Sequence, residues 1–190
     1  MTVVAAVLAA GGGRRFAASG GQGHKLLAPL RGRPLVAWAL EAVVAAGFDE
    51  VLVVSGSVDL SPVLAAFPVE VAANPAPEGG IATSLAVAVD HAAARGAAAL
   101  VVGLGDQPGV VPAAWRAVAD ESAAPVAVAT YGGRRGNPVR LGREVWPLLP
   151  RTGDEGARRL MGRRPDLVAE VACPGDPFDV DRVEDLGRWS

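Results

Sequence analysis

Residues 2–16 read TVVAAVLAAGGGRRF, and this stretch decides the fold. Its first nine residues are aliphatic or β-branched, which is typical of a buried strand, and the run stops at three consecutive glycines. A strand that turns sharply at glycines leaves backbone N–H groups facing one small volume. Two arginines follow directly, and a lysine comes at Lys25. Backbone donors and basic side chains around one volume favour a binding site for phosphate.

Two common phosphate-binding motifs do not fit this loop. The dinucleotide fingerprint Gly-x-Gly-x-x-Gly is met by Gly11 and Gly13, but Phe16 stands where close helix packing requires the third glycine. A Walker loop has serine or threonine after its lysine, whereas Leu26 follows Lys25 here. The loop is therefore of another kind.

Outward from this loop, strand-like and helical patterns alternate. Strand character is found in residues 3–8, 51–54, 69–72, 99–104 and 126–130, and helical character in 34–46, 60–67, 84–95 and 112–121. This alternation predicts βαβ units and a Rossmann-like α/β fold, with a mostly parallel sheet flanked by helices. After about residue 130 a glycine turn and an extended piece at 137–139 predict a small antiparallel excursion. We expect one domain over residues 1–190.

Composition narrows the class of partner. The 18 basic and 20 acidic residues nearly balance, so the chain lacks the charge that nucleic-acid binding requires. The single cysteine, Cys173, cannot form an internal disulfide, which favours a reducing compartment. No apolar run approaches the ~20 residues of a membrane span. We expect a cytoplasmic protein with a small-molecule partner, and neither a nucleic acid nor a membrane.

Carboxylates occur where an α/β sheet places its ligands, just after the strands. Asp106 directly follows the strand-like run 99–104, where its carboxylate would lie beside the glycine loop and hold Mg²⁺ against phosphate oxygens. The alternative is that Asp106 caps the following turn. Near the end of the chain, alternation puts Asp179 and Asp181 on one face, while Asp185 suits the cap of a terminal helix.

The start of the chain resembles the signature of the MobA-like nucleotidyltransferases, LAAGxSxRxG followed by a lysine. Leu8 to Gly11, Arg15 and Lys25 stand in the matching places. Two departures are visible: Ala17 replaces the usual glycine, and about eight extra residues, Ala18 to His24 among them, precede the lysine. We therefore expect a longer and more mobile loop than is usual in this family.

Further segments resemble the same family in the same order. They are LGDQP at 104–108, the segment FDVDRVEDL at 178–186, which is similar to DxDTPEDL, EGGIATSL at 78–85, RGNPV at 135–139 and GDEGAR at 153–158. In the second of these, Arg182-Val183 replaces Thr-Pro. Thr83 or Ser84 suits a helix cap that faces the nucleotide. Ala10 and the pieces RGNPV and GDEGAR are similar to the molybdenum cofactor cytidylyltransferase branch, and the overall fold implied is that of nucleotide-diphospho-sugar transferases.

The resemblance implies transfer of a nucleoside monophosphate, CMP from CTP, to the phosphate of an acceptor such as the molybdopterin cofactor, with release of pyrophosphate. Arg15 and Lys25 would be catalytic, Asp106 and Asp181 would hold Mg²⁺ with Asp179 as the substitute ligand, and Asn137 and Asp154 would contact the acceptor. The residues expected at the nucleotide are Leu8, Ala9, Ala10, Gly11, Gly12, Gly13, Arg15, Lys25, Gly80, Ser84 and Asp106.

Two other functions fit parts of the sequence. One is an NAD(P)H-dependent oxidoreductase acting on an aromatic heterocycle, although Asp59 is a poor candidate for the acid that binds the ribose. The other is a nucleotide-binding or chaperone role without catalysis, which would not require both metal-binding carboxylates. We expect no chemical role for His24, in the loop, or for His91, on a helix.

Overall fold

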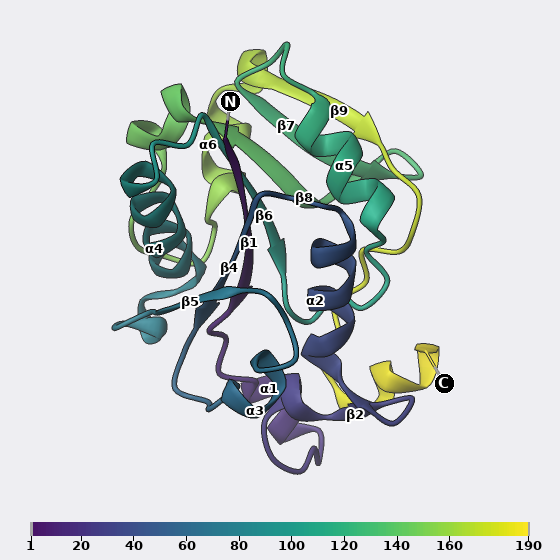
Figure 1. Ribbon diagram of the computed structural model, residues 1–190. Coiled ribbons are helices and arrows are strands. Elements are labelled where there is room, and N and C mark those ends of the chain that lie inside the picture. Colours follow the sequence, from purple (N-terminus) through teal and green to yellow (C-terminus); the bar gives the residue numbers. More distant parts are fainter. Residues whose placement is uncertain (1, 190) are drawn as a thin grey trace.

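A computed structural model describes residues 2–189. The chain forms a seven-stranded sheet in the order β5-β4-β1-β6-β8-β7-β9 and a small two-stranded antiparallel sheet of β2 and β3 (Figure 1). The strands are β1 (Val3–Ala9), β2 (Pro29–Leu30), β3 (Arg33–Pro34), β4 (Glu50–Ser55), β5 (Glu70–Ala73), β6 (Ala99–Leu104), β7 (Val126–Tyr131), β8 (Arg134–Gly142) and β9 (Val168–Ala172).

The helices lie on both faces of the large sheet, with α4 and α6 on one side and α2 and α5 on the other (Figure 1). The α-helices are α1 (Arg14–Ala18), α2 (Leu35–Ala45), α3 (Ser61–Leu64), α4 (Ile81–Ala94), α5 (Pro112–Asp120) and α6 (Ala157–Arg163). Short 3₁₀ helices span Lys25–Leu27, Pro77–Gly79, Arg143–Leu148, Pro165–Leu167 and Val183–Trp189. This architecture confirms the predicted mostly parallel α/β fold.

Alternation along the central strands builds the two cores. On β1, Val4, Ala6 and Leu8 pack towards α4, whereas Ala5 and Val7 pack towards α2 and α5. Both faces of β1 are buried, which explains why its sequence reads as a continuous apolar run rather than an alternating one. The parallel neighbours β4 and β6 end at the same edge as β1, so the residues that follow them meet there.

The predicted antiparallel excursion is confirmed and sets the second half of the sheet. β8 runs antiparallel to both of its neighbours, β6 and β7, while β7 pairs in parallel with β9. The strand β9 and the helix α6 were not predicted. Because β9 is partly exposed along its length, its sequence shows no clear alternation of apolar and polar residues.

Two local predictions are wrong or incomplete. Thr83 and Ser84 do not cap α4, because Gly80, with a φ of 88°, starts the helix three residues earlier and places both residues inside it. Thr83 instead donates to the carbonyls of Ala76 and Gly80. The helix expected at 60–67 is only the single turn α3, where Asp59 accepts a hydrogen bond from Ser61 N.

In the described residues, 2–189, there is no helix with both the length and the apolar character that crossing a membrane requires.

The packing of β6 against α5 yields a stability prediction. A Cβ atom on Gly103 would lie 2.5 Å from the indole ring of the buried Trp115. We expect Gly103→Ala to lower the free energy of unfolding by about 1–3 kcal/mol through overpacking. Thermal unfolding followed by circular dichroism measures this change.

The control is Gly162→Ala, at an exposed glycine inside α6, where alanine should match or raise the stability by up to about 1 kcal/mol. Equal stability of Gly103→Ala and the wild type would show that Trp115 does not confine this position.

Candidate nucleotide-binding site

A cleft of about 670 Å³ lies beyond the carboxyl ends of β1, β4 and β6. All eleven residues expected at the nucleotide line it: Leu8, Ala9, Ala10, Gly11, Gly12, Gly13, Arg15, Lys25, Gly80, Ser84 and Asp106. Asp154 and Asp181 line it as well. The structure therefore brings together residues that are as far apart in the sequence as Leu8 and Asp181.

The glycine loop joins β1 to α1 and is held from behind. Gly13 has a left-handed φ of 62°, and a Cβ atom there would lie 3.3 Å from Lys25 Cβ. His24 braces the loop: its Nδ1 accepts from Leu26 N, so its Nε2 donates to Gly11 O at 3.0 Å. Burial lowers the pKa of His24. The role of His24 is thus structural.

The inserted segment before Lys25 is anchored to the end of the chain. Ser19 Oγ accepts a hydrogen bond from Val183 N at 3.0 Å, and Gly21 N donates to Phe16 O. Phe16 is buried, and its ring packs so closely on Gly21 that a Cβ atom there would clash with it. These contacts tie the longer loop to the segment that carries Asp181.

Four charged side chains converge at the edge of the glycine loop. Lys25 Nζ lies 2.6 Å from Asp106 Oδ2 and 3.2 Å from Asp181 Oδ1, and Arg15 Nη1 lies 2.7 Å from Asp181 Oδ2. The side chains of Lys25 and Asp106 are only 10% and 19% exposed, whereas that of Arg15 is largely in solvent. The cluster therefore has a buried half and an open half.

Oppositely charged neighbours in this cluster shift the pKa values of Lys25 and Asp181. Burial disfavours the charged form of Lys25, but its attraction to Asp106 and Asp181 outweighs burial and raises the Lys25 pKa. Burial likewise acts against ionised Asp181, yet hydrogen bonds from Arg15 and Lys25 lower its pKa. Lys25 is therefore charged and Asp181 ionised at neutral pH.

Asp106 is not a turn cap. Its Oδ2 accepts from Lys25, and its Oδ1 is buried without a hydrogen-bond partner among residues 2–189. A buried carboxylate oxygen without a donor is uncommon in folded proteins, and such an oxygen can accept a bond from a ligand or an ion. The cap prediction holds for Asp185, whose Oδ2 accepts from Asp181 N and Arg182 N.

Asp179 occupies a different environment from Asp181. Its Oδ1 accepts from Gln107 Nε2 at 2.7 Å, and Gln107 Oε1 in turn accepts from Asn137 Nδ2 at 3.1 Å. Burial, followed by the nearby charge of Asp106, raises the pKa of Asp179. Gln107 is itself only 4% exposed, so its side chain forms an internal link between Asp179 and Asn137.

A second cavity, of about 380 Å³, adjoins the first on the side of β8 and α6. Its buried lining residues, such as Leu85, Val128 and Val139, are apolar. Its lining also includes the exposed Arg135 and Arg158 and the partly exposed Asn137. Leu8, Ile81, Leu104 and Asp154 line both cavities. Both residues expected at the acceptor, Asn137 and Asp154, thus line this second cavity.

Several lining residues were not expected from the sequence. They are Leu26, Ser57 and Pro77 in the first cavity, and Leu85, Val102 and Met161 among those in the second. Ser57 carried a usable signal, since it follows the carboxyl end of β4, where ligands gather. Ser84 was expected to face the nucleotide, and its hydroxyl also accepts from Asn74 Nδ2.

The chemistry open to this arrangement follows from its charges. Arg15 and Lys25 can bind the oxygens of a phosphate chain, and the glycine loop leaves room for a close backbone approach. Asp106 and Asp181 offer only oxygen ligands, which suits a hard divalent cation such as Mg²⁺ or Mn²⁺.

Known proteins resemble this chain along nearly its whole length. The nicotine blue oxidoreductase of Paenarthrobacter nicotinovorans is 32% identical over 201 residues, which cover 98% of this chain and 95% of that protein. A solved nucleotidyl transferase from Methanothermobacter is 27% identical with a TM-score of 0.85, covering 98% and 95% of the two chains.

The structure of Rv0371c from Mycobacterium tuberculosis H37Rv is 31% identical with a TM-score of 0.80, covering 99% of this chain and 97% of that one. Rv0371c has also been solved as a complex with manganese. A family model described as the MobA-like NTP transferase domain matches residues 5–168. On this evidence, together with the loop and cleft described above, the chain belongs to the MobA-like NTP transferase domain family.

Proposed function

We propose that this chain is a cytidylyltransferase that transfers CMP from CTP to the phosphate of a pterin-type acceptor. The observation that carries the proposal is the convergence of Arg15, Lys25, Asp106 and Asp181 beside the glycine loop. Family membership supports nucleotidyl transfer, and the resemblance of Ala10, RGNPV and GDEGAR to the cytidylyltransferase branch supports the base. We also propose that the protein acts in the cytoplasm and that residues 1–190 form one catalytic domain.

The reaction is an in-line displacement at phosphorus. An oxygen of the acceptor phosphate forms a bond to the α-phosphorus of CTP, and the bond from that phosphorus to the bridging oxygen of the β-phosphate breaks. Pyrophosphate leaves with the electron pair of that bond. Such chemistry requires alignment and charge neutralisation more than covalent participation of the protein.

Arg15 and Lys25 bind the β- and γ-phosphates and offset the charge that develops on the leaving pyrophosphate. Arg15 is exposed, so its guanidinium can leave Asp181 and follow the nucleotide, whereas the side chain of Lys25 is only 10% exposed. To reach the phosphates, Lys25 Nζ has to turn away from Asp106 and Asp181.

The residues present fit a divalent cation. The buried Oδ1 of Asp106 has no hydrogen-bond partner among the described residues, so it is available to coordinate a metal ion. Lys25 Nζ lies between the carboxylates of Asp106 and Asp181, so positive charge is stabilised at this position. Asp106 and Asp181 would hold Mg²⁺, which supplies charge neutralisation at the transferred phosphate. The manganese complex of Rv0371c supports a divalent ion in this family. We assign the second ligand to Asp181 rather than Asp179, because Asp181 lines the cleft.

The acceptor occupies the second cavity. Its volume of about 380 Å³ and its apolar buried lining suit a planar heterocycle, and the exposed Arg135 and Arg158 suit the acceptor's phosphate. Asn137 and Asp154 would contact the ring or its substituents.

A second candidate function is hydride transfer from a reduced nicotinamide nucleotide to an aromatic heterocycle. The 32% identity to nicotine blue oxidoreductase favours it. The same two cavities would hold the nucleotide and the heterocycle, but the carboxylates of Asp106 and Asp181 and the amine of Lys25 would then have no assigned task. For this reason we place it second.

Nucleotide titration separates these functions. We expect calorimetry with Mg²⁺ to show tighter binding of CTP than of GTP or NADPH, because the proposed base pocket and phosphate cluster fit CTP. Removal of Mg²⁺ should weaken CTP binding. Equal affinity for CTP and GTP would contradict the base assignment, and tighter binding of NADPH would favour hydride transfer.

Asp106→Asn tests the metal-dependent step. Asparagine keeps the shape of the side chain but loses the charge, so we expect transfer to fall by about 10²–10³-fold, as when other charge-stabilising groups are removed. The melting temperature should change little, because Lys25 retains Asp181 as a partner.

The matched control is Asp120→Asn, at an exposed aspartate at the end of α5, which should leave transfer unchanged. Transfer by Asp106→Asn near the wild-type rate at saturating Mg²⁺ would argue against Asp106 as a ligand.

Gln107→Met tests the internal link between Asp179 and Asn137. Without the amide donor, half-buried Asp179 loses a hydrogen bond, so the free energy of unfolding should fall by about 1–3 kcal/mol at neutral pH. The raised pKa of Asp179 means that its charge opposes folding above that pKa, and this penalty disappears as the pH falls through it towards 3.8. Loss of the Gln107 amide should raise the pKa of Asp179 further. The difference in free energy of unfolding between Gln107→Met and the wild type should therefore become smaller as the pH falls.

Urea unfolding at a series of pH values measures the Gln107→Met deficit. Gln22→Met, at the exposed glutamine of the loop, is the control and should stay within about 0.5 kcal/mol of the wild type. A deficit that does not change with pH would separate Gln107 from the ionisation of Asp179.

A further inference from the structure

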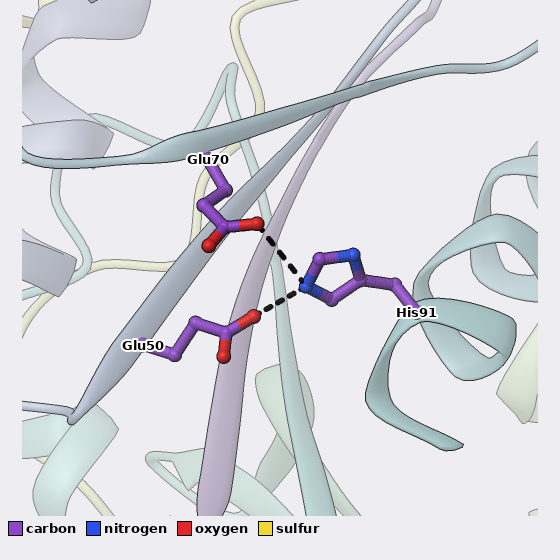
Figure 2. Close-up of side chains that lie close together, drawn as sticks. All are labelled: Glu50, Glu70 and His91. Carbon is purple, nitrogen blue, oxygen red and sulfur yellow. Dashed lines mark hydrogen bonds and ion pairs between the residues drawn. The ribbon is translucent and has the colours of Figure 1, made fainter. Parts of the chain in front are cut away.

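A second group of metal-ligating side chains lies at the opposite end of the sheet from the cleft. Glu50 begins β4, Glu70 begins β5, and His91 lies in the last turn of α4 (Figure 2). β4 and β5 are parallel neighbours, so their first residues share one edge, and α4 runs back across the sheet towards that edge. Three separate elements therefore converge here.

The strand register turns both glutamates towards α4. Glu70 is paired with Leu52, and Glu50 lies two residues before Leu52, so all three side chains project from the same face. Leu52 packs in the core beneath α4. The position of the carboxylates opposite His91 is thus fixed by backbone pairing rather than by flexible loops.

The ligand atoms are close enough to share an ion. His91 Nε2 contacts Glu50 Oε1 and lies 3.8 Å from Glu70 Oε2, and one ligand atom from each residue can be chosen so that all lie within 4.8 Å of one another (Figure 2). In a tetrahedral zinc site, ligand atoms at about 2.0–2.2 Å from the ion lie about 3.3–3.6 Å apart. His91 Nε2 and Glu50 Oε1 would therefore have to move apart, whereas Glu70 Oε2 is already near this distance from His91. The side chains of Glu50 and His91 are 17% and 18% exposed, and that of Glu70 is half exposed. The group is open to solvent on one side, where water can complete the coordination.

Arg95 occupies the solvent side of this group. Its Nη2 lies 2.5 Å from Glu70 Oε2, and its Nε lies 3.3 Å from Glu50 Oε1. The guanidinium balances one of the two carboxylates, so with a neutral imidazole the group keeps one excess negative charge. Arg95 follows the last residue of α4 and is nearly half exposed, so its side chain can turn into solvent. Arg95 is therefore a competitor for the position of a cation.

We propose that Glu50, Glu70 and His91 form a zinc-binding site that fastens α4 to the outer strands β4 and β5. An imidazole nitrogen with two carboxylates suits Zn²⁺ and similar transition ions, whereas Mg²⁺ prefers oxygen ligands alone. This chemistry distinguishes the site from Asp106 and Asp181. The site is independent of the reaction proposed above, because it lies at the other end of the sheet.

The binding experiment uses the full chain with Asp106→Asn and Asp181→Asn, which removes the carboxylate pair of the cleft as a competing site. After treatment with a chelator, calorimetry with ZnCl₂ should show one bound equivalent that excess Mg²⁺ does not displace. Co²⁺ should give the visible absorption of a bound transition ion. Zn²⁺ should also raise the melting temperature, because it binds the folded state.

Single substitutions in this parent test the ligands. Loss of an outer-shell partner weakens metal binding by about 10–100-fold, so loss of a ligand in His91→Ala should weaken Zn²⁺ binding by at least about 100-fold. The same effect is expected for the conservative Glu70→Gln, which keeps the fold if His91→Ala does not. Arg95→Gln should bind Zn²⁺ more tightly than the parent, an outcome that a simple ion-pair network would not produce.

Two controls belong to this series. Asp90→Asn changes an exposed carboxylate on α4 that pairs with Arg151, and His24→Gln changes the other histidine of the sequence. Neither should alter Zn²⁺ affinity. Absence of Zn²⁺ binding by the parent, or binding that survives both His91→Ala and Glu70→Gln, would overturn the proposal.

Discussion

The ion pair between Lys25 and Asp106 is the interaction on which the rest of the site depends. Asp106 and Asp181 approach one another at a partly buried edge, where two like charges repel strongly unless a cation lies between them. Lys25 Nζ supplies that cation from the first third of the chain. Val180 N donates to Asp106 O, and buried Val180 packs with Leu30 and Leu35, so the returning C-terminal segment is fastened beside the same carboxylate.

Most of the sheet could be predicted from the sequence because its central strands are buried on both faces. The apolar runs of β1, β4 and β6 are therefore continuous and end in glycine, serine or aspartate. The peripheral elements gave weaker signals. β9 is partly exposed throughout, and α6 lies behind Gly156 with only Leu160 and Met161 among its buried residues, so neither shows a strong period.

The residues of the candidate site likewise fall into those that could be predicted from the sequence and those that could not. Residues that follow a central strand, such as Gly11 and Asp106, were predicted because the fold itself places strand ends together. Gln107 was not assigned a role, because the three hydrogen bonds of its side chain in the described part of the chain run to residues 30 to 72 positions away. His91 was expected to be inert for the same reason: nothing in its local sequence shows that Glu50 and Glu70 face it from two strands.

The reversed direction of β8 has a consequence for how this scaffold can diverge. In the seven-stranded sheet β8 runs opposite to the other described strands, so its first residues rather than its last ones reach the edge where β6 ends. Arg135 and Asn137 therefore line the second cavity from the other half of the sheet. Four of the described residues line both cavities: Leu8, Ile81, Leu104 and Asp154. A substitution at one of these shared residues therefore changes both cavities at once, so at those positions the two cavities cannot diverge independently.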